Sequence, residues 1–146
     1  MDRGNFWGPL LGESALLVRE RLGARIGRLD MTPVQTHALL YLGDQGGSAA
    51  QTDLIAFMRL KAPTVNGILD RMEEKGLLVR VGDPEDGRRK LVTLTEKGQS
   101  LLAQTRQAFA ETETVMRKQF TEEECAQLME LLLRLRQNLK EDRELC

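Results

Sequence analysis

A helix followed by a hairpin is predicted by residues 62–95, which read APTVNGILDRMEEKGLLVRVGDPEDGRRKLVTLT. The apolar side chains of the first fourteen residues recur at helical spacing, at Val65, Ile68, Leu69 and Met72. Gly76 ends this helix. Residues 77–82 and 90–95 then predict two strands, because the second alternates Leu91 and Thr93 with Val92 and Leu94.

The loop that joins these strands, residues 83–89, is rich in turn chemistry and in charge. Pro84 and Gly87 favour a tight connection. Three basic residues follow in a row, at Arg88, Arg89 and Lys90, although the chain as a whole carries a net charge of −1. Such a run is more often a solvated surface than a binding site, so its meaning depends on the elements around it.

The rest of the chain is predominantly helical. Apolar periodicity predicts further helices at about residues 10–29, 32–42, 51–59, 96–119 and 122–139. Thr32 and Gln35 predict a capping box at the second of these, with Pro33 in its first turn. Thr121 and Glu124 predict another at the last. The apolar stripe of residues 96–119 is expected at Leu101, Leu102, Thr105, Phe109, Thr112 and Met116. The fold class predicted is mainly α with a small β-hairpin wing.

Composition is typical of a soluble globular protein of one domain. The chain has 146 residues, of which 41% are hydrophobic and 29% charged. No apolar run approaches the length of a membrane span, and we expect no signal peptide, so a cytoplasmic location is predicted. The two cysteines, Cys125 and Cys146, predict no disulfide framework; Cys125 is expected in the core, and Cys146 to be terminal and exposed. With a single histidine, we expect neither a metal site nor a cofactor.

Two short helices and a hairpin are the plan of a winged helix-turn-helix. A helix fits the major groove of B-DNA, where all four base pairs can be distinguished. Residues 59–90 contain eight basic and six acidic side chains, which makes the middle of the chain its basic part. The outward positions of the helix at 62–75 are small and polar near its start. The residues expected to contact DNA from this helix are Lys61, Ala62, Pro63, Thr64, Asn66, Gly67 and Arg71.

Within that set, Thr64 and Asn66 can exchange hydrogen bonds with base edges, whereas Lys61 and Arg71 suit phosphates. From the hairpin, Arg88 and Arg89 could enter a narrow minor groove, where arginine is favoured. We expect Asp86 to orient a guanidinium through a charge-assisted hydrogen bond.

At residues 32–120 the chain resembles the MarR family of bacterial transcription regulators. The motif that carries the resemblance is DGRRKLVTLTEKG at 86–98, which fits the family's wing pattern of acid, x, Arg, then an aliphatic, Leu-Thr and Gly. The segments LDRME at 69–73 and KGL at 75–77 resemble the end of the family's recognition helix. Thr32, Pro33 and Gln35 resemble the start of its second helix.

The resemblance implies a homodimer that binds a near-palindromic promoter site, usually as a repressor. It implies that residues 1–31 and 96–146 form a helical dimerisation region and that residues 32–95 form the DNA-binding lobe. It further implies that Arg88 is the minor-groove finger, that Asp86 positions it, and that residues 64–66 read bases. The wing residues expected at the DNA are Asp86, Arg88, Arg89 and Lys90. In relatives, small aromatic or phenolic effectors bind between the two regions. His37 and Tyr41, four residues apart, could line such a pocket, although a lone histidine is more often structural.

Three positions depart from the family pattern. Gly67 stands where many relatives carry a long side chain, Ala50 replaces a common hydroxyl cap, and Thr36 replaces a frequent aromatic residue. The first bears on the operator sequence and the last on the effector pocket.

Alternatives remain open on the sequence alone. The terminal helices could close a monomeric core instead of a dimer, although association buries their apolar stripes more easily. An enzyme is disfavoured, because there is no nucleophile paired with a base, no glycine-rich phosphate loop and no HExxH pair. A winged-helix module that binds protein instead of DNA is expected to lack the wing arginine, which this chain has.

Overall fold

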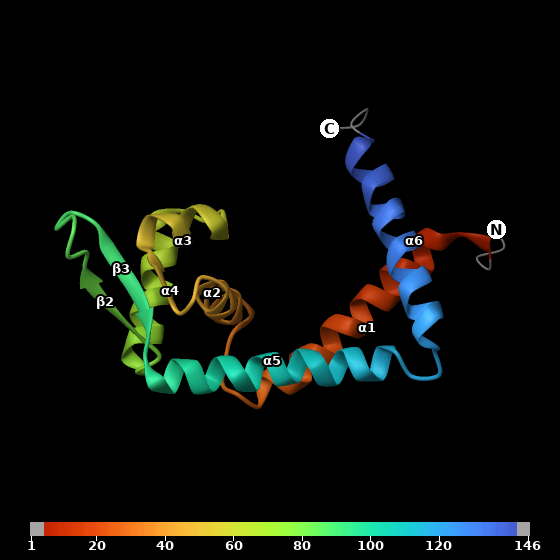
Figure 1. The fold of residues 1–146 in the computed structure, drawn as a ribbon, viewed down its shortest axis with the longest axis horizontal. Helices are drawn as coiled ribbons and strands as arrows, with labels where there is room; N and C mark the ends of the chain where they lie inside the picture. The colour runs from red at the N-terminus through yellow and green to blue at the C-terminus, as the bar shows by residue number, and fades with distance from the viewer. Residues whose placement is uncertain (1–4, 143–146) are drawn as a thin grey trace. The chain divides into compact units, whose positions relative to one another are not determined.

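The computed structural model describes residues 5–142, which are mainly helical with one small sheet (Figure 1). The elements in chain order are α1 (Trp7–Gly27), α2 (Pro33–Asp44), β1 (Ser48–Ala50), α3 (Gln51–Met58), α4 (Ala62–Glu74), β2 (Leu78–Gly82), β3 (Lys90–Leu94), α5 (Glu96–Met116) and α6 (Glu122–Glu141). The chain forms two compact units, of which one ends at Thr112 and the other begins at Glu113.

Helix α2 begins where its sequence predicts. The Thr32 hydroxyl oxygen accepts a hydrogen bond from the backbone nitrogen of Gln35 at 3.2 Å, and the Gln35 side chain accepts one from the backbone nitrogen of Thr32 at 3.3 Å. This reciprocal pair is a capping box, which satisfies two backbone donors that the first turn leaves free. Pro33 occupies the first helical position, as predicted.

The sheet has three strands where the sequence predicted two. β3 lies in the middle, and both neighbours run antiparallel to it. In the β2–β3 hairpin Leu78 pairs with Leu94, and the added strand β1 pairs Ser48 with Thr93. Both predicted strands are present, and the sequence missed only β1, because it has three residues and no alternating pattern to reveal it. The alternation of β3 is confirmed, because Val92 and Leu94 are buried whereas Leu91 and Thr93 are half-buried.

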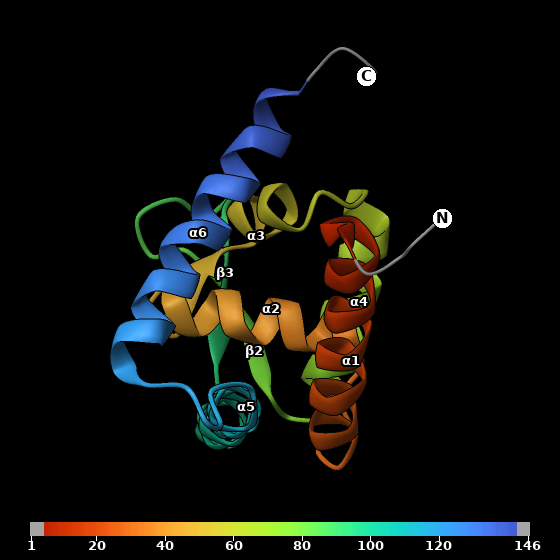
Figure 2. The ribbon, with the colours of Figure 1, turned by 90° about the vertical axis from the view of Figure 1, so that its right-hand side faces the viewer.

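The core of the first unit lies between the sheet and helices α2, α3 and α4. Figure 2 shows α2 crossing strands β2 and β3. The predicted inward stripe of α4 is confirmed, because Val65, Leu69 and Met72 are fully buried and Ile68 is nearly so. The buried stripe leaves the opposite face of α4 exposed, and that face is a candidate for contact with a partner.

Helix α5 begins after Thr95, whose hydroxyl oxygen accepts a hydrogen bond from the backbone nitrogen of Gly98 at 3.1 Å. The predicted stripe is partly wrong. Phe109 and Met116 are exposed, whereas the buried positions are Gly98, Leu102, Thr105, Ala108 and Thr112. Phe109 stands one residue, and therefore about 100°, beyond Ala108 on the helix, and Met116 lies past the last buried position.

Helix α6 starts at its predicted cap, where the Thr121 hydroxyl oxygen accepts a hydrogen bond from the backbone nitrogen of Glu124 at 3.1 Å. None of its residues is buried within this chain. Cys125 is half-buried, so its expected place in the core was wrong. Cys146 lies outside the described residues. No helix in the described part of the chain is long and apolar enough to cross a membrane.

Candidate nucleic-acid interface

The N-terminal half of α4 presents a small and uncharged surface. Ala62, Pro63 and Thr64 are exposed, and Gly67 is half-exposed with open space around its Cα. Lys61 precedes the helix in an extended conformation, and it is exposed, as is Arg71 farther along. A helix face of this kind allows the backbone to approach base edges closely, with cations at its borders.

Asn66 differs from its neighbours, because its side chain already has a partner within the fold. The amide oxygen of Asn66 accepts a hydrogen bond from Nε2 of Gln51, the first residue of α3, at 2.6 Å. The Oε1 atom of Gln51 is buried and has no hydrogen-bond partner in the described structure. The pair therefore connects α3 to α4 and engages the Asn66 amide oxygen, while the Asn66 amide nitrogen keeps its donors for a base edge.

The wing loop is organised by Asp86, but not in the way the sequence suggested. Its carboxylate accepts a hydrogen bond from the backbone nitrogen of Arg88 at 3.1 Å, and its carbonyl accepts one from the backbone nitrogen of Arg89 at 3.0 Å. Within residues 5–142, no ion pair joins Asp86 to a guanidinium. The expected charge-assisted bond was wrong, because a short carboxylate two residues away reaches the backbone more readily than the end of an arginine.

The guanidinium of Arg89 pairs instead with Asp53. Its Nη2 atom lies 3.3 Å from Oδ2 of Asp53, which stands in the first turn of α3. The wing tip is thereby connected to the helix that precedes α4. Arg88 and Lys90 remain exposed on either side.

Replacing Asp53 with asparagine is expected to strengthen DNA binding. The change removes an acid beside the wing and frees Arg89 for a phosphate, at the cost of an exposed ion pair. We expect affinity for DNA to rise roughly two- to fivefold. An exposed ion pair contributes at most about 1 kcal/mol, which corresponds to the upper end of this range. Fluorescence anisotropy on a bound duplex measures this. An affinity that falls would show that the Asp53–Arg89 contact holds the wing in its binding position.

Arg80 connects the wing to the recognition helix. It extends from β2 to Glu73 of α4, with Nε 2.7 Å from the carboxylate, and its Nη2 atom donates to Asp70 of the same helix. The hydrogen bond to Asp70 raises the pKa of Arg80 above its ordinary value, more than burial lowers it, and Glu73 adds to the rise. The contact joins strand and helix, and its single positive charge offsets one of the two negative charges of Asp70 and Glu73. Sequence reasoning counted Arg80 among the basic residues but did not place it.

His37 and Tyr41 share a face of α2, as their spacing predicts. Both rings lie against Phe57 of α3, with ring centroids 4.8 Å apart for His37 and 4.3 Å apart for Tyr41, the latter stacked. His37 is exposed, Tyr41 is half-buried, and Phe57 is 43% exposed. The three rings therefore offer an accessible aromatic surface. Thr36 faces inward and donates its hydroxyl to the Thr32 carbonyl at 3.0 Å.

The described residues hold no cluster of three or more histidine, cysteine or acidic side chains that could bind a metal ion. Ala50 precedes α3 without a side-chain cap, which matches its departure from the family pattern.

A helix-turn-helix of α3 and α4 followed by the β2–β3 hairpin defines a winged-helix DNA-binding protein. Comparison with known proteins narrows this class. Residues 29–89 match the MarR family. A probable transcriptional regulator from Pseudomonas aeruginosa is 30% identical over 90% of this chain and 97% of its own, with a TM-score of 0.68.

MepR is a second relative, described as a transcription regulator of the Staphylococcus aureus multidrug efflux pump MepA. It is 27% identical over 92% of this chain and 98% of its own, with a TM-score of 0.80. A complex of S. aureus MepR with DNA is similar at 28% identity and a TM-score of 0.71, over 91% and 98% of the two chains. The chain belongs to the MarR family and is a transcription regulator with the winged-helix fold of MepR.

Proposed function

We propose that the chain binds a near-palindromic promoter site as a homodimer, represses transcription there, and is released by a small aromatic or phenolic effector. The observation that supports DNA binding best is the exposed, uncharged start of α4 beside a wing that carries Arg88, Arg89 and Lys90. Lys61 and Arg71 flank the helix as phosphate contacts in this proposal. The solved complex of the relative MepR with DNA supports the same reading.

Dimerisation is supported by apolar side chains that the single chain leaves uncovered. Helix α1 exposes Trp7, Leu10, Leu16 and Leu17. Helix α6 exposes Leu128, Met129, Leu131, Leu132, Leu133 and Leu139. Apolar surface of this extent is typical of an interaction site. We therefore assign residues 1–31 and 96–146 to dimerisation and residues 32–95 to DNA binding, and a two-fold dimer then reads two half-sites about 34 Å apart or a multiple of it.

The effector site is placed on the aromatic surface of His37, Tyr41 and Phe57. Flat rings stack on other aromatic rings, and a phenolic hydroxyl can hydrogen-bond to an imidazole. The proposal gives the chain no catalytic role, because its family and its structural relatives are DNA-binding regulators. Its place is the cytoplasm of a bacterial cell, where promoter DNA lies.

Two measurements on the unaltered protein test this function. Selection from a random duplex library, followed by anisotropy at low and moderate salt, is expected to yield a two-fold symmetric sequence and binding that weakens with salt. Light scattering is expected to give twice the mass of one chain at micromolar concentration. A monomer, or a protein that ignores duplex DNA at low salt, contradicts the proposal. Simple phenols and aromatic acids are then added to the protein–DNA complex, and a fall in anisotropy is expected if they release the protein from the duplex.

A further inference from the structure

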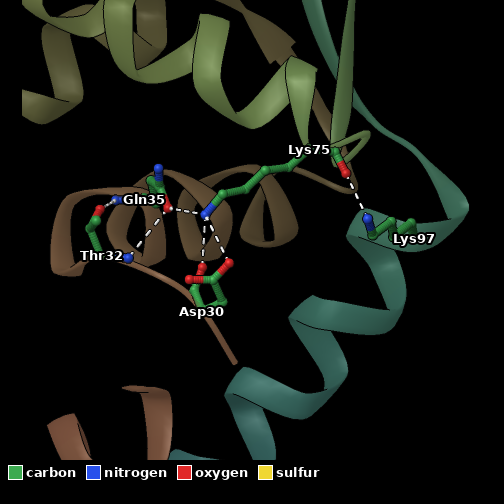
Figure 3. Close-up of polar contacts among 5 residues, drawn as sticks. All are labelled: Asp30, Thr32, Gln35, Lys75 and Lys97. Atoms are coloured by element: carbon green, nitrogen blue, oxygen red, sulfur yellow. Dashed lines mark hydrogen bonds and ion pairs between the residues drawn. The ribbon is translucent and has the colours of Figure 1, made fainter. Parts of the chain in front are cut away.

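The C-terminal end of α4 is connected to the turn between α1 and α2 by one lysine. The ammonium of Lys75 donates a hydrogen bond to the carbonyl oxygen of Asp30 at 2.8 Å and one to Oε1 of Gln35 at 3.3 Å (Figure 3). The Asp30 carboxylate is farther, at 3.9 Å, and that side chain is fully exposed. The carbonyl and the amide are therefore the acceptors that matter.

Lys75 is also connected through its backbone to α5. Its carbonyl oxygen accepts a hydrogen bond from the ammonium of Lys97 at 2.8 Å (Figure 3). The last carbonyls of a helix have no partner within it, so a lysine from another element satisfies one of them and complements the helix dipole. The end of α4 is thus bonded both to the α1–α2 turn and to α5.

The acceptors of Lys75 belong to the capped start of α2 and to the turn before it. Gln35 is only 4% exposed, and the same oxygen already accepts the backbone nitrogen of Thr32 in the capping box. Asp30 has a φ of 54°, in the left-handed region that few residues other than glycine adopt. The Lys75 side chain is 35% exposed. A partly buried ammonium that donates to a buried, hydrogen-bonded amide oxygen holds its geometry better than an exposed surface pair.

Apolar packing joins these elements only in part. Met31, Met72, Leu77 and Leu102 belong to one buried cluster, and Leu29 and Leu101 pack against it. A pocket of about 310 Å³ lies between them, lined by Leu29, Asp30, Lys75, Leu77, Lys97 and Leu101 among others. Helix α4 packs on α2, α3 and β2. Beside this pocket, the polar contacts of Lys75 and Lys97 add to the apolar core and bond the end of α4 to the α1–α2 turn and to α5.

We propose that Lys75 is a positioning residue that fixes the direction of the recognition helix relative to α1 and α5, and thereby sets which spacing of DNA half-sites the dimer accepts. The inference rests on the proposed function, in which α1 and α5 belong to the dimerisation region. A small rotation of α4 against that region changes the distance between the two recognition helices. Lys75 itself touches no DNA.

The test replaces Lys75 with methionine, which keeps the aliphatic stem and removes the donor. The probes are the duplex selected by the wild-type protein and versions with one or two base pairs added or removed at the centre. Each added pair turns one half-site by about one tenth of a helical turn. We expect affinity for the selected duplex to fall about tenfold, the loss typical of one hydrogen bond from a charged group. Affinity for the duplexes with altered spacing should fall far less. The difference in affinity between the selected spacing and the altered ones therefore becomes smaller.

Three variants serve as controls. Asp30→Asn keeps the backbone carbonyl that accepts from Lys75, so it should retain the wild-type spacing profile. If the ion pair between Lys75 and the Asp30 carboxylate were the contact that matters, this variant would lose that profile. Lys75→Arg restores donors at the same place and should recover most of the discrimination. Lys61→Met removes a phosphate contact in the proposal, so it should weaken binding at every spacing alike and flatten the salt dependence.

A measurement without DNA separates this inference from the function it rests on. Amide hydrogen exchange over residues 28–36 should become faster in Lys75→Met, while amides in the buried half of α4 stay protected. Unchanged exchange, or a Lys75→Met protein with the wild-type spacing profile, overturns the inference while DNA binding stands. A wild-type protein that binds no duplex overturns the proposed function, and the inference with it.

Discussion

Replacing Gly98 with alanine is expected to destabilise the fold by about 3 kcal/mol or more, at the upper end of what overpacking costs. An added Cβ would stand 2.0 Å from the carbonyl oxygen of Leu77 and 3.0 Å from its carbon. Both are backbone atoms, which cannot rotate away as a side chain does. The same Leu77 oxygen accepts a hydrogen bond from the backbone nitrogen of Thr95 at 3.0 Å, so moving it breaks the cap region of α5.

Equilibrium unfolding in urea at one fixed protein concentration measures this loss. A matched control is Gly67→Ala in α4, where an added Cβ meets nothing within 4 Å. That change should stabilise the protein by about 0.5–1 kcal/mol, because alanine is the better helix former. If Gly98→Ala unfolds at the wild-type urea concentration, α5 does not approach Leu77 as closely as described here.

Local features of this fold were readable from sequence because they depend on neighbouring residues. The capping box of Thr32 and Gln35 spans three residues, and the stripe of α4 follows helical spacing, so both were predicted and both are confirmed. The sequence identified Gly98 as part of the wing motif, but it did not show why this position requires glycine. Only the structure shows that the backbone at Leu77 leaves no room for a Cβ.

Contacts between distant residues escaped prediction. Gln51 and Asn66 are fifteen positions apart, Asp53 and Arg89 thirty-six, and Lys75 and Asp30 forty-five. No local pattern marks either partner of these pairs. Strand β1 was missed for the same reason, because three residues form a strand only when β3 lies beside them. Which residues touch DNA stays a prediction, since exposure alone does not identify a contact.

Replacing Arg88 with alanine is expected to weaken operator binding by about 1–3 kcal/mol, a loss of roughly 5- to 150-fold. Arg88 is exposed at the wing tip, and its backbone is held by the Asp86 carboxylate. Within residues 5–142 its guanidinium has no hydrogen bond or ion pair. The group is therefore free to enter a groove, and binding does not first have to break a contact.

The same freedom predicts that Arg88→Ala folds normally. An exposed side chain without partners in the described structure changes stability by no more than about 0.5 kcal/mol. Thermal unfolding of the free protein should therefore be unchanged, which separates a loss of contact from a loss of fold. Arg89→Ala is the matched control on the same loop. Because Asp53 already engages Arg89, its removal should cost less affinity than removal of Arg88.

Arg88→Lys decides what kind of contact is lost. A narrow minor groove favours the planar, weakly hydrated guanidinium over the strongly hydrated ammonium, whereas a phosphate accepts either cation. If Arg88 enters the groove, lysine should recover only part of the affinity, and the preference for particular bases outside the two major-groove sites should relax. Full recovery by lysine would make Arg88 a phosphate contact. An Arg88→Ala protein with wild-type affinity would remove the wing from the interface and leave α4 as the element that binds DNA.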